Sequence, residues 1–574
     1  ANTTGSQNTA LGKSALSANT TASFNTAVGR QALRDNTTAA NNTAVGFNSL
    51  LLNTTGADNT AVGKGALDAN TTASFNAAFG SNALGANTTG ASNTGLGVSA
   101  LAANTTASNN VAIGTSALLS NTTGSFNTAV GVFALDANTT AGNNLAIGYG
   151  ALGANTTGDL NIAIGNNALD ANTEGDRSLA IGYNALTNQN PSTNADMYNI
   201  AIGHNAGAGI TTGVVNTIIG GLAGDSLTDA DHNVAIGYLS LTADTLGSRS
   251  VAIGRGTLAS QNFTTATDTY NTAVGYAAGN DITTGTQNTF IGGLAGDANT
   301  TANNNTAVGY NSLGANTTGT QNVAIGTFAL DANTTANNNV AIGHGSLGEN
   351  TTGTQNTAIG ALALNDNTTA NNNVAIGANA LEENTTGGSN TAVGTNALEA
   401  NTTGAQNTAV GAFALDANTA DLNTAVGFNS QILTTTGQLN TSVGASSLDA
   451  NTTGGSNTSI GYNSLTANTT GNSNVALGRD ALAANTTASN NTAIGKDALK
   501  ANTTGNSLLA VGHSALMTCT TVSNLTAIGF EAGKANTTGT SLTALGYKAL
   551  TANTTGGNNT ALGRDALLVN TEGG

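Results

Sequence analysis

Residues 25–41 read NTAVGRQALRDNTTAAN, and close copies of this stretch follow one another along almost the whole chain. The glycine of the Asn-Thr-Ala-Val-Gly phrase marks each copy and recurs every 17 residues from Gly12 to Gly182. After an irregular segment the same step continues to Gly563, which gives about 33 units in 574 residues. A fixed repeat of this kind is typical of a solenoid, in which each unit packs only on its neighbours.

The unit can be written Asn-Thr-Ala-Val-Gly-x-x-Ala-Leu-x-x-Asn-Thr-Thr-Gly-x-x, with its places numbered as positions 1 to 17. Positions 1 to 4 alternate as a short strand does, which predicts that positions 2 and 4 (Thr26, Val28) point inward and position 3 (Ala27) outward. Position 9 (Leu33) is predicted to supply a third inward group on an opposing strand. The density of Asn, Thr and Gly disfavours a helix. We therefore expect an all-β parallel solenoid, a β-roll or β-helix of about 33 coils of 17 residues, with two short strands and two turns in each coil.

Glycines and asparagines recur at fixed places in this coil. Glycines at positions 5 and 15, such as Gly29 and Gly56, are expected at bends, because glycine adopts a positive φ without strain. Asparagines at positions 1 and 12, such as Asn25 and Asn36, are expected to stack in amide ladders, and the one at position 12 to tolerate a left-handed backbone. With roughly 4.8 Å between stacked strands, the coils would form a rod on the order of 160 Å long.

Position 3 is nearly always a small residue, as at Ala27, Ala44 and Ser442. A strip of small outward side chains would let another chain approach closely. This pattern favours lateral association, most simply a homotrimer of parallel rods. A single-chain rod with a small-residue face is the alternative.

The irregular segment divides the chain into three parts of one continuous solenoid: regular coils over 1–182, variant coils over 183–291 and regular coils over 292–574. Two four-residue insertions fall in the middle part, within 187–198 and 260–270, and the surrounding sequence recurs at a distance of 72 residues. We expect the insertions to bulge from turns and leave the stack intact. The alternative is that this band is a binding site, since loops on rigid scaffolds carry function. The chain begins and ends within a unit, so we expect either the interior of a longer protein or a unit that joins end to end.

Composition argues against several classes of function. The net charge is −17 and only 7% of residues are charged, with no basic stripe, so nucleic-acid binding is not expected. Cys519 is the single cysteine, so no intrachain disulfide can form. No run of 18 apolar residues is present, so no membrane span is expected in this chain.

No constellation of residues indicates catalysis. The four histidines are scattered and Cys519 occupies position 12 without a partner arrangement, so we expect no catalytic, cofactor-binding or metal-binding residues, no cofactor and no enzyme activity. Asn-Thr-Thr is formally a glycosylation acceptor in nearly every coil, but a turn asparagine in a stacked ladder is the simpler interpretation. Seven of nine tyrosines lie at position 6, where they could contact sugars or a partner chain or pack on a neighbouring coil: Tyr149, Tyr183, Tyr238, Tyr276, Tyr310, Tyr462 and Tyr547.

The phrase Asn-Val-Ala-Ile-Gly, as at 110–114 and 233–237, resembles the repeat of YadA-like trimeric autotransporter adhesin heads. The longer phrase that begins at Asn25 and ends with the Asn-Thr-Thr of 36–38 looks like the repeat regions of tail-fibre proteins carrying an endosialidase-type chaperone domain. The resemblance covers essentially the whole chain. It implies a left-handed parallel β-roll with three chains side by side, exposed on a bacterial surface or a virion.

The leading hypothesis is an extracellular structural fibre: a long β-solenoid rod that serves as a surface filament or adhesive shaft. A homotrimer or an end-to-end filament is the expected assembly, and a cell-surface or glycan receptor is a possible partner. The first alternative is a bacteriophage tail-fibre shaft. The second is an ice-binding repeat protein, with positions 12 and 14 forming an outward array of Asn and Thr.

Overall fold

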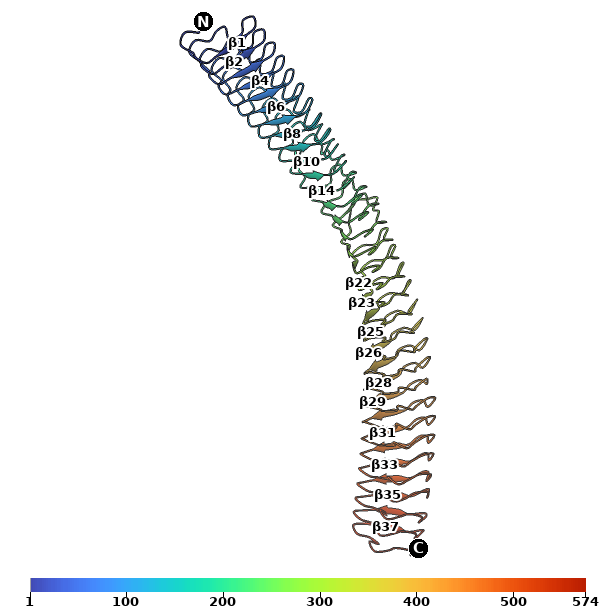
Figure 1. Ribbon diagram of the computed structural model, residues 1–574. Coiled ribbons are helices and arrows are strands. Elements are labelled where there is room, and N and C mark those ends of the chain that lie inside the picture. Colours follow the sequence, from blue (N-terminus) through green and yellow to red (C-terminus); the bar gives the residue numbers. More distant parts are fainter. Residues whose placement is uncertain (1, 574) are drawn as a thin grey trace. The chain divides into compact units, whose positions relative to one another are not determined.

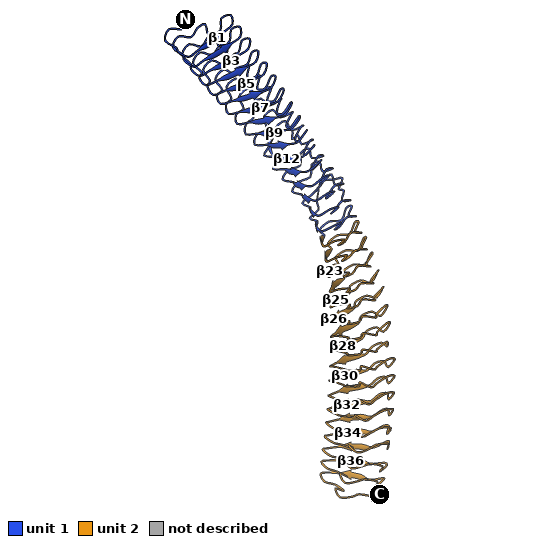
Figure 2. Ribbon diagram, in the orientation of Figure 1, with its two compact units in different colours: residues 1–288 blue, residues 289–574 orange. Residues whose placement is uncertain are grey.

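The computed structural model of the chain describes residues 2–573 and divides it into two compact units, one up to Asn288 and one from Thr289 onward (Figure 2). Within residues 2–573 no helix is present. In each unit three-residue strands lie side by side in one sheet, one strand per coil (Figure 1).

The strands of the first unit are β1 (Thr9–Leu11), β2 (Thr26–Val28), β3 (Thr43–Val45), β4 (Thr60–Val62), β5 (Ala77–Phe79), β6 (Thr94–Leu96), β7 (Val111–Ile113), β8 (Thr128–Val130), β9 (Leu145–Ile147), β10 (Ile162–Ile164), β11 (Gly175–Asp176), β12 (Leu179–Ile181), β13 (Ala195–Asp196), β14 (Ile200–Ile202), β15 (Thr217–Ile219), β16 (Val234–Ile236), β17 (Gly247–Ser248), β18 (Val251–Ile253), β19 (Thr267–Asp268) and β20 (Thr272–Val274). Those of the second unit are β21 (Thr289–Ile291), β22 (Thr306–Val308), β23 (Val323–Ile325), β24 (Val340–Ile342), β25 (Thr357–Ile359), β26 (Val374–Ile376), β27 (Thr391–Val393), β28 (Thr408–Val410), β29 (Thr424–Val426), β30 (Thr441–Val443), β31 (Thr458–Ile460), β32 (Val475–Leu477), β33 (Thr492–Ile494), β34 (Leu509–Val511), β35 (Thr526–Ile528), β36 (Thr543–Leu545) and β37 (Thr560–Leu562).

Consecutive strands pair in parallel and place like residues opposite one another. In the first unit Thr26 lies opposite Thr43 and Ala27 opposite Ala44, and the second unit repeats the same register, as in the pairing of Thr391 with Thr408. The prediction of an all-β parallel solenoid with coils of 17 residues is therefore confirmed. The prediction of two strands per coil is wrong, because positions 6 to 17 of a regular coil run through turns and bends. Left-handed winding stays a prediction.

The direction of the strand side chains is the reverse of the prediction. Ala27 is fully buried, whereas its neighbours Thr26 and Val28 are partly exposed, and the same pattern recurs in strand after strand. Position 3 therefore faces the interior, and positions 2 and 4 face out. The physical reason is the thinness of the coil: Leu33 at position 9 is fully buried as predicted, and the space left opposite it accommodates only a small side chain.

Both asparagine columns are buried, and in the regular coils their amides bind the same coil and a neighbouring one. Asn25 at position 1 donates its amide to the carbonyl of Ala39 at position 15 (3.0 Å) and accepts the backbone N–H of Asn42 in the next coil (2.9 Å). Asn53 at position 12 donates to the side chain of Asn36 in the preceding coil (2.9 Å) and to the carbonyl at its own position 15 (2.8 Å). The predicted ladder is confirmed at position 12, and at position 1 it runs through the backbone instead.

The two glycine positions differ in backbone conformation. Gly29 at position 5 has φ +131, and a Cβ there would lie 2.4 Å from the carbonyl oxygen of Gly46 in the next coil, so glycine is required on both counts. Gly56 at position 15 does not have a positive φ, and Asn36 does not adopt the expected left-handed conformation. The left-handed non-glycine residues lie instead at positions 7, 9 and 17, as at Leu33 (φ 50).

The two insertions leave the stack of strands intact, as predicted. β12 pairs with β14, and β18 with β20, in the ordinary register. Each insertion forms a two-residue parallel pair with the preceding coil, β11 with β13 and β17 with β19. Outside each pair an arginine binds an aspartate and a tyrosine hydroxyl: Arg177 with Asp196 and Tyr198, and Arg249 with Asp268 and Tyr270. These contacts hold the inserted residues against the solenoid.

The interior becomes polar around the one-residue deletion between Gly411 and Gly427. Gln431 occupies position 9, the place of the buried leucine, and its Nε2 donates to Ser442 (2.8 Å) and to the carbonyl of Thr424 (2.9 Å). Its Oε1 is buried without a partner, and so is the Oδ1 of Asn401 where the position-12 ladder breaks. An unsatisfied buried acceptor costs about 1–3 kcal/mol, so this is a weak place in the second unit.

Replacing Gln431 by leucine should strengthen these coils. The substitution removes the unpartnered Oε1 and restores the apolar column, so we expect the local free energy of opening to rise by about 1–3 kcal/mol. Amide hydrogen exchange of residues 424–443 measures this directly, because repeat proteins open locally. The matched control is Leu448→Gln one coil later, which should accelerate exchange there. Faster exchange in Gln431→Leu would contradict the assignment of this site as a defect.

Candidate functional site: the exposed strand face

The outward side chains of positions 2 and 4 form two continuous columns along the sheet of each unit. They are threonine, valine, isoleucine or leucine in almost every coil, and none of the 33 three-residue strands in the described chain contains a charged residue. Leu96 is 46% exposed and Ile113 is 36% exposed. β-Branched residues suit strands in general, but a column of exposed valine, isoleucine and leucine at position 4 is more than propensity requires.

The area of this strand face can be compared with the areas of known apolar patches and protein interfaces. In the first unit 16 strands belong to the sheet. A strip of 16 strands, three residues wide, covers on the order of 750 Å². Monomeric proteins rarely expose contiguous apolar patches larger than a few hundred Å², whereas a partner in a stable complex typically contributes about 800 Å². The strand face therefore has the size and composition of an interface.

Three phenylalanines stand at the edge of this face in the first unit. Phe24, Phe75 and Phe126 occupy position 17, the bend that leads into the strand, and are 58%, 65% and 61% exposed. Their φ angles are 60°, 64° and 63°. A left-handed backbone costs a residue other than Gly, Asn or Asp roughly 1–2 kcal/mol. These residues were not among those predicted from the sequence. The signal that could have revealed them is a phenylalanine recurring every 51 residues at position 17, where the coils between hold Asn, Asp or Ser.

The residues considered for chemistry do not come together. Within residues 2–573 no group of three or more His, Cys, Asp or Glu side chains is placed to hold a metal ion. His204 stacks on Tyr183 (5.4 Å between ring centroids), and His513 on Phe530 (5.3 Å). Cys519 is fully buried, and burial raises the pKa of its thiol to about 11, so the thiol is protonated at neutral pH.

The position-6 tyrosines lie on the surface and contact neighbouring coils. Tyr547 is 42% exposed and stacks on Phe530 (5.3 Å), with Arg564 over its ring. In the first unit Arg255 lies over both Tyr238 and Tyr276 (5.9 and 5.6 Å). These contacts fit the interpretation that the tyrosines pack on neighbouring coils, and they leave the ring edges exposed.

The Asn-Thr-Thr sites are not available for modification in the folded coils. Asn36 and Asn53 are fully buried, and the amide nitrogen of each donates to two oxygens. A glycan on this nitrogen would break the ladder. The turn-asparagine interpretation is therefore the one that the packing supports.

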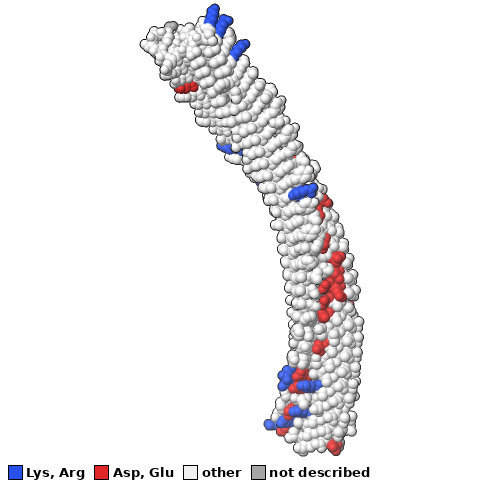
Figure 3. All heavy atoms as spheres, in the orientation of Figure 1, with Lys and Arg blue, Asp and Glu red and all other residues white. Residues whose placement is uncertain are grey.

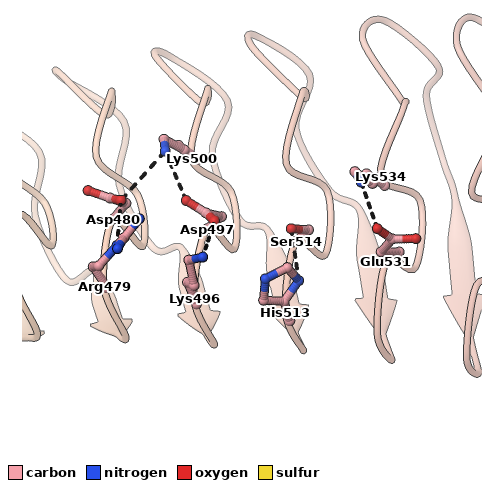
Figure 4. A network of polar contacts seen from close by, with 9 residues as sticks. All are labelled: Arg479, Asp480, Lys496, Asp497, Lys500, His513, Ser514, Glu531 and Lys534. Atoms are coloured by element: carbon pink, nitrogen blue, oxygen red, sulfur yellow. Dashed lines mark hydrogen bonds and ion pairs between the residues drawn. The ribbon is translucent and has the colours of Figure 1, made fainter.

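Charged side chains gather in a few places and neutralise one another in part (Figure 3). Around residues 479–534 of the second unit, Lys500 bridges Asp497 (2.9 Å) and Asp480 (3.5 Å), and Lys534 pairs with Glu531 (2.6 Å; Figure 4). The hydrogen bond from Lys534 is the main cause of the lowered pKa of Glu531. Exposed pairs of this kind contribute about 0–1 kcal/mol.

Burial raises the pKa of several carboxyl groups, and two of them stand out. In the second unit, burial first and then the charge and hydrogen bond of Glu399 raise the pKa of Asp416 to about 6. In the first unit, burial raises the pKa of Asp244, which replaces asparagine at position 12 and is fully buried. Asp244 accepts hydrogen bonds from Gln261 (2.6 Å) and from the backbone N–H of Phe263 (3.0 Å) and Gly247 (3.1 Å). The corresponding residue 72 places earlier is Asn172, which receives the same kind of bond from Gln189 (3.3 Å).

No protein-family model and no curated protein matches the sequence. No helix within residues 2–573 is long and apolar enough to cross a membrane.

Replacing Asp244 by asparagine should stabilise its coil at neutral pH and remove a pH dependence. Since burial raises the folded-state pKa above the ordinary value of 3.8, local stability is greatest below about pH 4 and falls as the pH rises through the folded-state pKa. Asparagine carries no charge and can donate to the carbonyl of Gly247. Local amide exchange of residues 241–247, corrected for its intrinsic pH dependence, at pH 5 and pH 8 tests this.

The matched control is Asn172→Asp, which should acquire the pH dependence that Asp244→Asn loses. If Asp244→Asn opened more readily than the parent chain at pH 8, the carboxylate would be stabilising and the argument from burial would be wrong.

Proposed function

We propose that the chain is a structural fibre protein of a cell surface or virion, in which parallel copies associate through the strand face. The observation that carries the proposal is the uncharged strand face, whose positions 2 and 4 hold β-branched or leucine side chains in all strands of the sheet except that of Ala77 and Phe79. Burial of apolar area is the main driving force of association, and a face that repeats in every coil suits a partner that repeats in the same way.

A homotrimer of parallel chains is the assembly that we propose. The basis for lateral association differs from the one that the sequence suggested, because the small residues of position 3 lie inside and the larger residues of positions 2 and 4 lie outside. The resemblance to trimeric adhesin heads points to three chains. The hydrogen-bonded stack supports a mechanical role: within each unit consecutive coils are joined by backbone bonds, and regular coils also by two asparagine columns, which suits a shaft that transmits force.

A bacteriophage tail-fibre shaft would be the same kind of rod, carried by a virion instead of a cell. A chaperone domain encoded downstream of this chain would favour the tail fibre over the cell-surface fibre. The ice-binding alternative loses its basis. The asparagines of position 12 are buried, so the proposed outward array of Asn and Thr keeps only the exposed threonines of position 14.

Charge on the strand face should separate the copies. We expect the parent protein to sediment at about three times its chain mass of 55.8 kDa. Ile113→Glu, Ile147→Glu and Ile164→Glu combined should give single chains with unchanged circular dichroism, because buried unpaired carboxylates oppose association.

The control places three glutamates on position 14 of nearby coils, as Thr123→Glu, Thr140→Glu and Thr157→Glu, where the side chains are exposed away from the strands. This variant should keep the parent mass. A parent protein that sediments at 55.8 kDa at all accessible concentrations would rule out the proposed association.

A further inference from the structure

We propose that Phe24, Phe75 and Phe126 fix the axial register between neighbouring copies of this chain. The inference rests on the proposed lateral association and adds to it the residues that decide which coil of one chain lies beside which coil of the next. The partner is a second, parallel copy, and the contact lies at the edge of the strand face in the first unit.

These three rings have no aromatic or cationic partner in their own chain. Several other exposed rings of the first unit do have one: Arg30 lies over Phe47 at 5.4 Å, and Phe133 packs edge-on against Tyr149 at 6.0 Å. Among the residues that the structure describes, neither an aromatic nor a cationic group packs on Phe24, Phe75 or Phe126. Each ring is also more exposed than Phe47, at 41%.

The backbone at position 17 has a positive φ in coil after coil. The coils between the phenylalanines hold Asn41, Asp58, Ser92 or Asn109 there, and later coils of the first unit also accept apolar residues such as Leu160 and Val215. Asparagine and aspartate adopt a left-handed backbone more readily than other non-glycine residues, and their side chains are well solvated. Phenylalanine has neither property. Contact with a neighbouring chain would remove these apolar rings from water.

The spacing of the three phenylalanines identifies the partner. The three phenylalanines are 51 residues apart, which is three coils of 17, or roughly 14 Å along the stack. A partner that meets all three rings must repeat at the same distance. A parallel copy of this chain does so necessarily, because its coils have the same rise.

Position 2 and position 4 cannot set this register alone. Their columns of threonine, valine and isoleucine look nearly the same after a shift of one coil, about 4.8 Å. The phenylalanines break that equivalence, since a one-coil slip displaces all three rings together. Polar or bulky markers at intervals have this role in other repeating interfaces, where they select one register among many similar ones.

Cysteine cross-linking of the full chain tests the register. Chains with Thr60→Cys, on the strand face of the first unit, are mixed with chains carrying Thr94→Cys two coils further on. In the parent background we expect like-with-like disulfides, Cys at 60 to Cys at 60 and at 94 to 94. The native Cys519 is buried and does not compete.

Combining Phe24→Ser, Phe75→Ser and Phe126→Ser should lower the ratio of in-register to mixed disulfides by about tenfold or more, as expected when three aromatic contacts no longer favour one register. The sedimentation mass should stay that of the assembly. Serine is the residue at the same position in Ser92, so the coil can fold. The control, Phe47→Ser and Phe133→Ser, removes rings that already have partners in their own chain and should leave the ratio unchanged.

The outcomes separate the two proposals. If the parent chain does not associate, both the fibre assembly and the register contact are wrong. If it associates but the triple variant keeps the parent ratio, or if the parent gives no like-with-like disulfide at position 60, the register contact alone is wrong and the assembly stands.

Discussion

In each regular coil two buried asparagine amides donate to one carbonyl group. Asn25 and Asn36 both bind the carbonyl of Ala39, at 3.0 and 2.9 Å, and so close the coil across its interior. Because a buried amide must be fully hydrogen-bonded, each asparagine also binds the coil above or below it. The same contacts thus fix the length of the coil, its stacking and the alignment of like residues. They also explain why the Asn-Thr-Thr sequence is structural, since the nitrogen that a glycan would need is already used.

The thinness of the coil follows from this arrangement and determines what lies outside. Two amides, a leucine and small side chains fill the interior, so the larger β-branched residues of the strand must face out. The coil thereby carries its most apolar sheet surface on the exterior. A solenoid built in this way gains its cohesion along the stack from hydrogen bonds and carries its remaining hydrophobic area on its surface. In the assembly that we propose, stability along the fibre and association across it are consequences of one cross-section.

The repeat was enough to predict the architecture: a step of 17 residues with a β-branched phrase predicts parallel coils, and the asparagine columns, Leu33 and the intact insertions are where they were expected. The direction of the strand could not be decided by alternation alone, because alternation is symmetric between its two faces. The residue that could have decided the direction was Thr26. If position 2 pointed inward, the threonine hydroxyl found there in most coils would need a buried hydrogen-bond partner. The polar interior around Gln431 and the left-handed backbone of Phe24 depend on packing between coils, which a single unit of sequence does not contain.

The most direct test of this account is a cross-section of the purified protein by cryo-electron microscopy. It predicts one strand per chain in each layer of roughly 4.8 Å, with Ala27 and its equivalents inside the coil and the side chains of positions 2 and 4 meeting those of neighbouring chains at the centre. A map in which those side chains face solvent on all copies, or in which the alanines form the contact between chains, would contradict it.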